Sequence, residues 1–498
     1  MEQRKTVRPS GGTSAEPDSG GANGGAGGQE EAGALSRLAV RTSNFSEKWF
    51  PEAFVFALIA LVVVTGAALS IGASPAEVTR EFGNGFWDLI PFAMQMAFVA
   101  IGGYVVATAP AARALIARIA SWPASGPGAV ALIATVSTFS SLLNWGFSLI
   151  FSGLLARRVA RRDELNVDYR AAGAAAFMGL GSVWALGLSS SAAQLQANAA
   201  SIPDNLMPIT GVIPFRDTIF LWQSLLVAAV LIPVVVAIAY FSAPRGAQVR
   251  RAPDLGVDLD DEEDAKLPPR TRPGEWLEYS PLLSLLVVVL GVGWAVQEFA
   301  AEDPLVAISG LNTYNLLFLL LGMLLHWRPR SFLNAVAKAV PATSGVLIQF
   351  PVYAAIAAVL TRPTNGAGHS VADYLTQAFT SLSSAAPFPM VVAVYSAVLG
   401  FFIPSGGGKW LIEAPYVMDA ANGLEQNLGW TVQVYNAAET LPTLINPFWM
   451  LPLLGILKLR ARHLVGFTFL QLLFLAPLML ALLTVLSYTL GYTPPAVP

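Results

Sequence analysis

Residues 388–415, FPMVVAVYSAVLGFFIPSGGGKWLIEAP, decide the fold. The stretch is mainly apolar up to Ile403 and again after Glu413, and between them it carries Pro404-Ser405-Gly406-Gly407-Gly408-Lys409. In hydrocarbon an unpaired backbone N–H or C=O costs several kcal/mol, so unwound chain survives there only inside protein or beside a water-filled cavity. If this stretch lies in a membrane, its Gly-rich turn is therefore expected to receive a polar ligand.

The composition places the chain in the membrane class. Of its 498 residues 54% are hydrophobic and 12% are charged, with a mean hydropathy of +0.57, whereas soluble domains carry about 25% charged residues. Strand-like alternation is absent, so we predict an all-α integral membrane protein. Most of the apolar windows are long enough to cross a hydrocarbon core of about 30 Å; they lie near residues 50–71, 87–108, 128–156, 171–192, 218–242, 279–299, 313–326, 343–360, 388–403, 430–457 and 464–489.

The residue inventory excludes several kinds of chemistry. The chain has no cysteine, which excludes disulfides, redox thiols and thiolate metal sites. Its three histidines, His326, His369 and His463, are too scattered for metal-ligand spacing. No metal site, bound cofactor or nucleic-acid partner is expected, although Na⁺ or H⁺ could serve as a coupling ion. Ser405 lacks a neighbouring base arranged to activate its hydroxyl, so an enzyme is disfavoured.

Basic residues mark the cytoplasmic side of membrane proteins, and here they predict two re-entrant segments. Window 128–156 has basic loops at both ends and a polar break at Leu143-Asn144-Trp145-Gly146, so it should enter and leave from the cytoplasm. With the remaining basic loops inside, segment 388–421 should enter and leave from the opposite side. We therefore predict about nine transmembrane helices and two oppositely oriented re-entrant hairpins, with the N-terminus inside and the C-terminus outside.

This order of segments predicts an inverted repeat, which is the architecture of many secondary transporters. The alternative is that Pro and Gly only kink ordinary spans. The predicted parts are listed in chain order: a disordered cytoplasmic tail, 1–43; a first repeat, 44–242, with hairpin 128–156; a cytoplasmic loop, 243–278; a linking helix, 279–299; a second repeat, 305–489, with hairpin 388–421; and a C-terminal tail, 490–498.

Six ordered motifs resemble the bacterial short-chain fatty acid transporter family, the acetoacetate and butyrate permease type: 83–98 GNGFWDLIPFAMQMAF, 142–162 LLNWGFSLIFSGLLARRVARR, 311–326 LNTYNLLFLLLGMLLH, 344–356 SGVLIQFPVYAAI, 401–421 FFIPSGGGKWLIEAPYVMDAA and 445–456 INPFWMLPLLGI. The resemblance covers about residues 44–489. It implies a multi-pass permease of the bacterial cytoplasmic (inner) membrane, within the ion-transporter superfamily, that is commonly a homodimer. Family members more often carry His or another neutral polar residue at position 409 and Gln at 413, where this chain has Lys409 and Glu413.

Residues at the two tips are the candidate substrate ligands. Amides of Ser405, Gly406, Gly407 and Gly408 precede a helix, and helix N-termini bind anions; the alternative is a tight packing turn. Asn144, at the opposite tip, could bind substrate oxygen or cap its own turn. Gln95 and Gln349 occupy similar helix centres, where interhelical bonding is as good an explanation as ligand contact. Lys409 could attract a carboxylate or form a structural ion pair with Glu413, which lies four residues later on the same helix face.

A second group of polar residues could couple transport to an ion. Glu439 lies mid-span, and intramembrane carboxylates usually mark ion pathways. Thr443 and Asn446 follow it, and Glu413 and Ser190 complete the candidate set. These side chains suit Na⁺ or a proton, and packing by small polar residues is the alternative at Ser190.

The sequence thus predicts a secondary active transporter that takes up short-chain monocarboxylates such as butyrate and acetoacetate, by cation symport with alternating access. Import or export of another small organic anion, such as a dicarboxylate or an amino-acid derivative, is the alternative. The substituted pair at 409 and 413 keeps that alternative open.

Overall fold

The computed structural model describes residues 53–259, 267–301, 304–382 and 384–495, and the predicted tail 1–43 lies outside them. Within these ranges all regular elements are helices and there is no β-strand, which confirms the all-α prediction. The first half contains α2 (Ala53–Ser70), α3 (Pro75–Gly85), α4 (Ile90–Thr108), α5 (Pro110–Ile119), α6 (Gly126–Leu143), α7 (Trp145–Ala160), α8 (Tyr169–Ser182), α9 (Ser191–Gln196), α10 (Met207–Thr210) and α11 (Trp222–Ser242).

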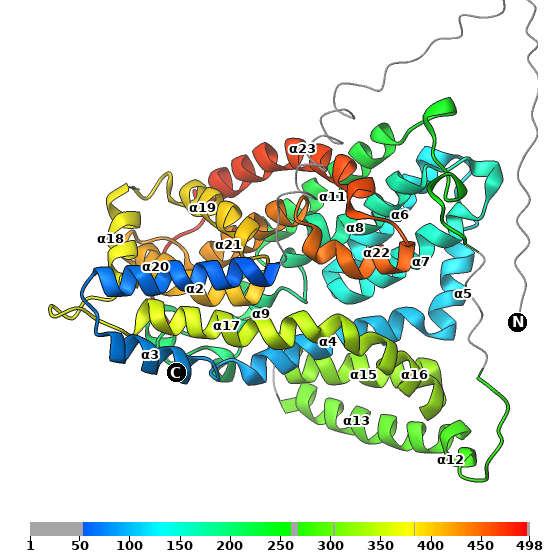
Figure 1. Cartoon of the computed structure of the whole chain (residues 1–498), viewed down its shortest axis with the longest axis horizontal. Helices are drawn as coiled ribbons and strands as arrows, with labels where there is room; N and C mark the ends of the chain where they lie inside the picture. Colours follow the sequence, from blue (N-terminus) through cyan, green and yellow to red (C-terminus); the bar gives the residue numbers. More distant parts are fainter. Residues whose placement is uncertain (1–52, 260–266, 302–303, 383, 496–498) are drawn as a thin grey trace, which may run out of the picture.

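The second half begins at a helix pair that lies at the edge of the molecule in Figure 1. It contains α12 (Glu275–Tyr279), α13 (Pro281–Ala301), α14 (Pro304–Ser309), α15 (Leu311–His326), α16 (Pro329–Ala339), α17 (Ser344–Thr361), α18 (Val371–Leu382), α19 (Phe388–Phe402), α20 (Gly406–Gly423), α21 (Leu428–Thr443), α22 (Leu451–Leu457) and α23 (Ala461–Ser487).

Several helices are long and apolar enough to span a membrane. Among the described residues six qualify, and a seventh is obtained if α21 and the segment Pro447–Leu457, bent by 76°, count as one span. Helix α13 is the least enclosed of the six, with only 17% of its apolar window buried inside the protein. The chain is therefore a multi-pass membrane protein.

The same packing relations occur in both halves of the chain. Helix α6 packs on α8 as α19 packs on α21, and α4 packs on α7 as α17 packs on α20. Helix α15 lies against α4, and α2 lies against α17; the second pair runs side by side in Figure 1. The last long helices of the halves, α11 and α23, pack on each other.

Two pairs of consecutive helices, α6–α7 and α19–α20, are each joined by a short polar segment, which we call a tip, and the two tips have similar geometry. Between α6 and α7, Asn144 is extended and its Oδ1 accepts a hydrogen bond from the Phe147 amide at 2.8 Å. Between α19 and α20, Ser405 is extended and its Oγ accepts from the Gly408 amide at 3.1 Å. Each residue is thus the N-cap of the second helix of its pair, a role in which Asn and Ser are favoured because the side-chain oxygen satisfies a free helix amide.

Small residues let neighbouring helices close onto these tips. A Cβ on Gly103 of α4 would overlap the Asn144 side chain and the Phe147 amide. A Cβ on Gly408 would overlap the ring of Tyr353 on α17. Close helix approach through small residues is the usual packing mode in membranes, where burial of apolar surface does not drive association.

Candidate functional site

The Lys409 ammonium lies at the centre of a fully enclosed polar cluster. Its Nζ is 2.8 Å from Glu413 Oε1 and 3.0 Å from Glu439 Oε2. It also donates to Ser396 Oγ at 2.5 Å and to the Ser396 carbonyl at 3.1 Å. The relative exposure of Lys409 and Glu413 is 0%, and that of Glu439 is 1%. We refer to Lys409, Glu413, Glu439, Ser396 and Tyr435 as the ammonium cluster.

Three helices build the ammonium cluster. Lys409 and Glu413 lie one turn apart on α20, Ser396 comes from α19, and Tyr435 and Glu439 lie one turn apart on α21. The ring centroid of Tyr435 is 4.1 Å from Lys409 Nζ, which is within the range of a cation–π contact. Residues four apart share a helix face, so α20 and α21 each present a pair of side chains to the other.

The α19–α21 contact depends on a glycine. A Cβ on Gly400 would lie 2.8 Å from Glu439 Oε2 and 2.9 Å from Pro442 Cγ. No side chain larger than hydrogen fits there without shifting the carboxylate. Gly400 therefore allows Glu439 to reach Lys409.

The ammonium cluster is not internally neutral when every group is ionised. One lysine and two glutamates leave one excess negative charge in a site that water does not reach. Glu413 Oε2 and both Glu439 oxygens have no hydrogen-bond partner among the described residues, although Glu439 Oε2 forms an ion pair with Lys409. Burying an unbalanced charge is costly, as is burying an unpaired polar atom.

The Gly-rich tip before α20 is covered by packed side chains. A Cβ on Gly406 would lie 2.7 Å from the Trp184 ring, and one on Gly407 would lie 2.7 Å from the Phe92 ring. The Tyr435 hydroxyl donates to the Gly406 carbonyl at 2.5 Å. In this conformation the tip is closed, and aromatic rings occupy the space that a ligand at its amides would need.

The other tip is held by its own turn and by neighbouring backbone. Asn144 Nδ2 donates to the Val99 carbonyl of α4 at 3.4 Å, while its Oδ1 caps α7. The Tyr314 hydroxyl of α15 donates to the Leu143 carbonyl at 2.6 Å. The Asn144 amide is thus engaged in local structure here.

A serine triplet connects the two tips. Ser189 Oγ accepts from the Trp145 amide at 3.0 Å at the first tip. At the second tip, a Cβ on Gly407 would lie 3.2 Å from Ser191 Cβ. Ser190 Oγ, between them, is buried and has no partner in the described structure. The segment after α8 therefore touches both tips at once.

Among the described residues, the other candidate ligands from the sequence form no hydrogen bond with Lys409, and each forms its own hydrogen bonds. Gln95 Nε2 donates to Asn312 Oδ1 of α15 at 2.9 Å. Gln349 Oε1 accepts from the Tyr353 hydroxyl at 3.0 Å, and the Tyr353 ring lies on Gly408. The remaining two bond to backbone: Thr443 Oγ1 donates to the Glu439 carbonyl at 2.9 Å, and Asn446 Nδ2 donates to the Phe401 carbonyl at 3.0 Å.

Sequence reasoning missed three polar residues of this region, Ser396, Tyr435 and Gln196. Ser396 and Tyr435 contact Lys409 directly, and the only sequence signal was the spacing of four between Tyr435 and Glu439. Gln196 is fully buried with neither side-chain polar atom bonded within the described ranges, and the same holds for Gln194, which the sequence indicated only weakly. Two unsatisfied buried amides near the serine triplet are unusual, because buried polar groups nearly always find partners.

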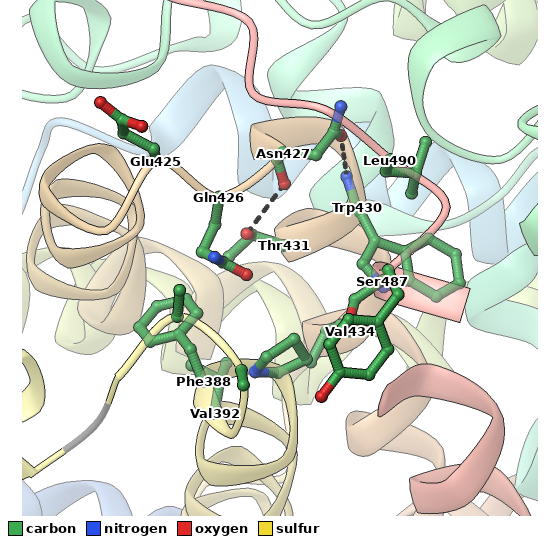
Figure 2. Close-up of a pocket in the computed structure, with 14 residues that line it drawn as sticks. Phe388, Val392, Glu425, Gln426, Asn427, Trp430, Thr431, Val434, Ser487 and Leu490 are labelled. Atoms are coloured by element: carbon green, nitrogen blue, oxygen red, sulfur yellow. Dashed lines mark hydrogen bonds between the residues drawn. The ribbon is translucent and has the colours of Figure 1, made fainter. Parts of the chain in front are cut away.

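A pocket of about 320 Å³ lies toward the N-terminal end of α21. Figure 2 shows Asn427 there, bonded to the Trp430 amide and to the Thr431 hydroxyl. Val392 of α19 and Val434 of α21 also line it. Val392 is four residues before Ser396, and Val434 directly precedes Tyr435, so two lining residues lie within about one helical turn, some 5 Å along the helix, of members of the ammonium cluster.

Comparison with known proteins gives a consistent assignment. A family model described as Short chain fatty acid transporter matches residues 34–486. A protein of Escherichia coli (strain K12), provisionally named a short-chain fatty acid transporter, is 31% identical over 446 residues, covering 88% of this chain and 97% of the relative. A Haemophilus influenzae protein of the same provisional name is 30% identical over 449 residues, covering 89% and 98%.

Two solved transporter structures share the fold. The YdaH transporter of Alcanivorax borkumensis has a TM-score of 0.55 at 14% identity, covering 88% of this chain and 98% of the other. MtrF of Neisseria gonorrhoeae, presented as illuminating a class of antimetabolite efflux pumps, has a TM-score of 0.54 at 14% identity, covering 92% and 100%. The fold, the near-complete family match and the two relatives agree: this chain belongs to the short-chain fatty acid transporter family, whose members are membrane transporters and not enzymes.

Proposed function

We propose that this protein is a secondary active transporter that takes up short-chain monocarboxylates, such as butyrate and acetoacetate, across the bacterial cytoplasmic membrane by cation symport. The observation that carries the proposal is the closed pair of polar tips, both touching the Ser189–Ser191 triplet, next to a buried ion cluster. Discontinuous helices that meet within the membrane are where secondary transporters bind substrate and coupling ion.

The proposed topology has nine crossings and two re-entrant hairpins related by an inverted repeat. The repeated packing relations of the two halves support it, as do the matching N-caps at Asn144 and Ser405. In this topology hairpin 128–156 opens to the cytoplasm and hairpin 388–421 opens outside, with 243–278 as a cytoplasmic loop and 279–299 as the link between repeats. A homodimer is proposed from the family resemblance.

The closed tips correspond to an occluded state in the proposed alternating-access cycle. For a carboxylate to reach the amides of Ser405 to Gly408, the rings of Trp184, Phe92 and Tyr353 must withdraw. In this structure the Gly408 amide donates to Ser405 Oγ and the Ser405 amide donates to the Ile403 carbonyl. The amides of Gly406 and Gly407 at the helix start would then supply hydrogen-bond donors without a fixed counter-charge, which allows both binding and release. Asn144 faces the same region through the serine triplet and would contribute from the other half.

Uptake into proteoliposomes tests the function directly. Purified protein should accumulate labelled butyrate and acetoacetate when a cation gradient is imposed, with Na⁺ and pH gradients applied separately. A panel of unlabelled acids added to the assay distinguishes monocarboxylates from dicarboxylates and amino-acid derivatives, because only true substrates compete. Vesicles that take up neither acid but exchange another organic anion would overturn the monocarboxylate assignment.

We also propose that the pocket beside Val434 is the outer entrance to the ion cluster. The chain has no cysteine, so a single Thr431→Cys variant needs no further background change. A membrane-impermeant thiol reagent added from outside should modify this cysteine and reduce butyrate uptake, because Thr431 lines the pocket.

A matched control lies on the same helix. Thr440 is buried, as Thr431 is, but does not line the pocket, so a cysteine in its place should stay unmodified. Equal labelling of both cysteines, or labelling of Thr431→Cys only from the inner side, would contradict an outer entrance.

A further inference from the structure

The Lys409 ammonium has the surroundings of a bound monovalent cation. Four oxygen atoms lie 2.5–3.1 Å from Nζ: the Ser396 carbonyl, Ser396 Oγ, Glu413 Oε1 and Glu439 Oε2. The face of Tyr435 covers another side. Carbonyl, hydroxyl and carboxylate oxygens are also the ligands that discontinuous transporter helices offer to Na⁺.

The side chain that fills this position is tethered and cannot leave. Lys409 is anchored in the first turn of α20, and its whole side chain is buried. A Na⁺ ion placed among the same oxygens would coincide with Nζ. The position is therefore closed to a mobile cation as long as the lysine is charged and in place.

We propose that the Lys409 ammonium serves as a built-in cation in place of Na⁺, so that transport needs no Na⁺ and is driven by a proton held between Glu413 and Glu439. This inference rests on the proposed function for its transport cycle. The part of it that concerns structure, namely that the Lys409 ammonium occupies the cation position, does not depend on the identity of the substrate.

The charge of the buried cluster indicates that it binds one proton. The lysine neutralises one of the two carboxylates, and a single proton on the other makes the buried cluster neutral. Among the described residues Glu413 Oε2 and both Glu439 oxygens have no hydrogen-bond partner, and only Glu439 Oε2 of these three lies in ion-pair range of Lys409 Nζ. Glu413 Oε2 or Glu439 Oε1 can therefore carry that proton. A monocarboxylate that enters together with one proton moves no net charge, so uptake should not respond to membrane potential.

Within the described ranges, the other ionisable groups near the two carboxyls are phenols. Tyr395 of α19, Tyr416 of α20 and Tyr435 of α21 lie near Glu413, and Tyr353 of α17 lies near Glu439. Phenols are neutral near pH 7. Lys409 and the two glutamates therefore set the charge of the cluster.

The test compares wild-type protein with Lys409→Ala. Wild-type proteoliposomes should take up labelled butyrate under a pH gradient, alkaline inside, equally well when choline replaces all Na⁺. Lys409→Ala leaves the four oxygens around an empty position with two carboxylates. Its uptake should fall about tenfold or more without Na⁺ and recover when Na⁺ is added. Lys409→Gln, whose side chain is one atom shorter than that of lysine and places a neutral amide beside the position, should not recover.

A second readout does not require transport. The melting temperature of purified Lys409→Ala should rise by several degrees in NaCl relative to choline chloride, since an ion that binds only the folded state stabilises it. Wild-type protein should show no such difference. If no acid is taken up under any gradient but this shift is seen, the substrate assignment fails and the occupied cation position stands.

Two results would overturn the inference. One is wild-type uptake that a Na⁺ gradient drives at equal pH on both sides. The other is a Na⁺-specific rise of the wild-type melting temperature. If Lys409→Ala does not fold, the two wild-type measurements still decide between Na⁺ and the ammonium.

Discussion

Glu439→Gln is expected to abolish accumulation of butyrate under a pH gradient while leaving a folded protein. The substitution removes one of the two buried carboxylates, so Lys409 and Glu413 form a neutral pair and no proton is required. Without a titratable partner the cluster cannot couple substrate movement to proton movement. The net uptake rate should fall by about two orders of magnitude, which corresponds to a transport barrier raised by about 2.7 kcal/mol.

Exchange transport separates coupling from binding. Glu439→Gln vesicles preloaded with unlabelled butyrate should still exchange it for labelled butyrate, because the tip amides are unchanged. Glu164→Gln is the matched control: Glu164 is an exposed carboxylate in a surface ion pair with Arg162, and its loss should leave uptake unaltered. Full accumulation by Glu439→Gln would exclude Glu439 as the coupling group.

The second large effect is expected for Gly408→Val, which should prevent stable folding of the α19–α20 helix pair. The added side chain would overlap the Tyr353 ring on α17, and Ser405 Oγ lies 2.8 Å from the same Cβ position. Overpacking typically costs about 1–3 kcal/mol, and a branched side chain at a helix tip belongs at the upper end. The measurement is the yield and melting temperature of purified protein.

A double variant tests whether steric overlap is the cause. Gly408→Ala should be less harmful than Gly408→Val, and Tyr353→Ala should open space for the new methyl group. Combined with Tyr353→Ala, Gly408→Ala should therefore cost less than the two single changes predict when added, which is the signature of a direct contact. Strict additivity would show that the two positions do not compete for space.

Local features of the site followed from the sequence, and tertiary features did not. The polar break at Asn144 and the Gly-rich stretch after Pro404 could be recognised in the sequence, because polar or Gly-rich residues within an apolar segment predict an interrupted membrane helix. The spacing of Lys409 and Glu413 indicated a shared helix face, and their charged atoms lie 2.8 Å apart. Glu439 contacts Lys409 because of the way α21 packs on α19 and α20. This packing cannot be predicted from a single sequence.

Tertiary packing also determines the roles of Ser396, which the sequence did not indicate, and of Gln95, whose partner it did not predict. Ser396 reads as an ordinary small residue in an apolar helix, and it matters only because Lys409 points at it. Gln95 looks like Gln349 in sequence but bonds to Asn312, because α15 lies on that side of α4. The membrane class and all-α fold needed only composition and periodicity, which are independent of such neighbours.

The placement of three charges on consecutive helices also constrains how the protein is made. Lys409 and Glu413 emerge from the ribosome before Glu439, and each charged residue costs about 2.5–3.5 kcal/mol at the centre of an inserting helix. Helix α20 should therefore wait beside the translocon or inside the half-assembled bundle until α21 arrives. Nascent chains that end before residue 439 should leave α20 unassembled and open to degradation, so the order of synthesis becomes part of how the buried cluster is assembled.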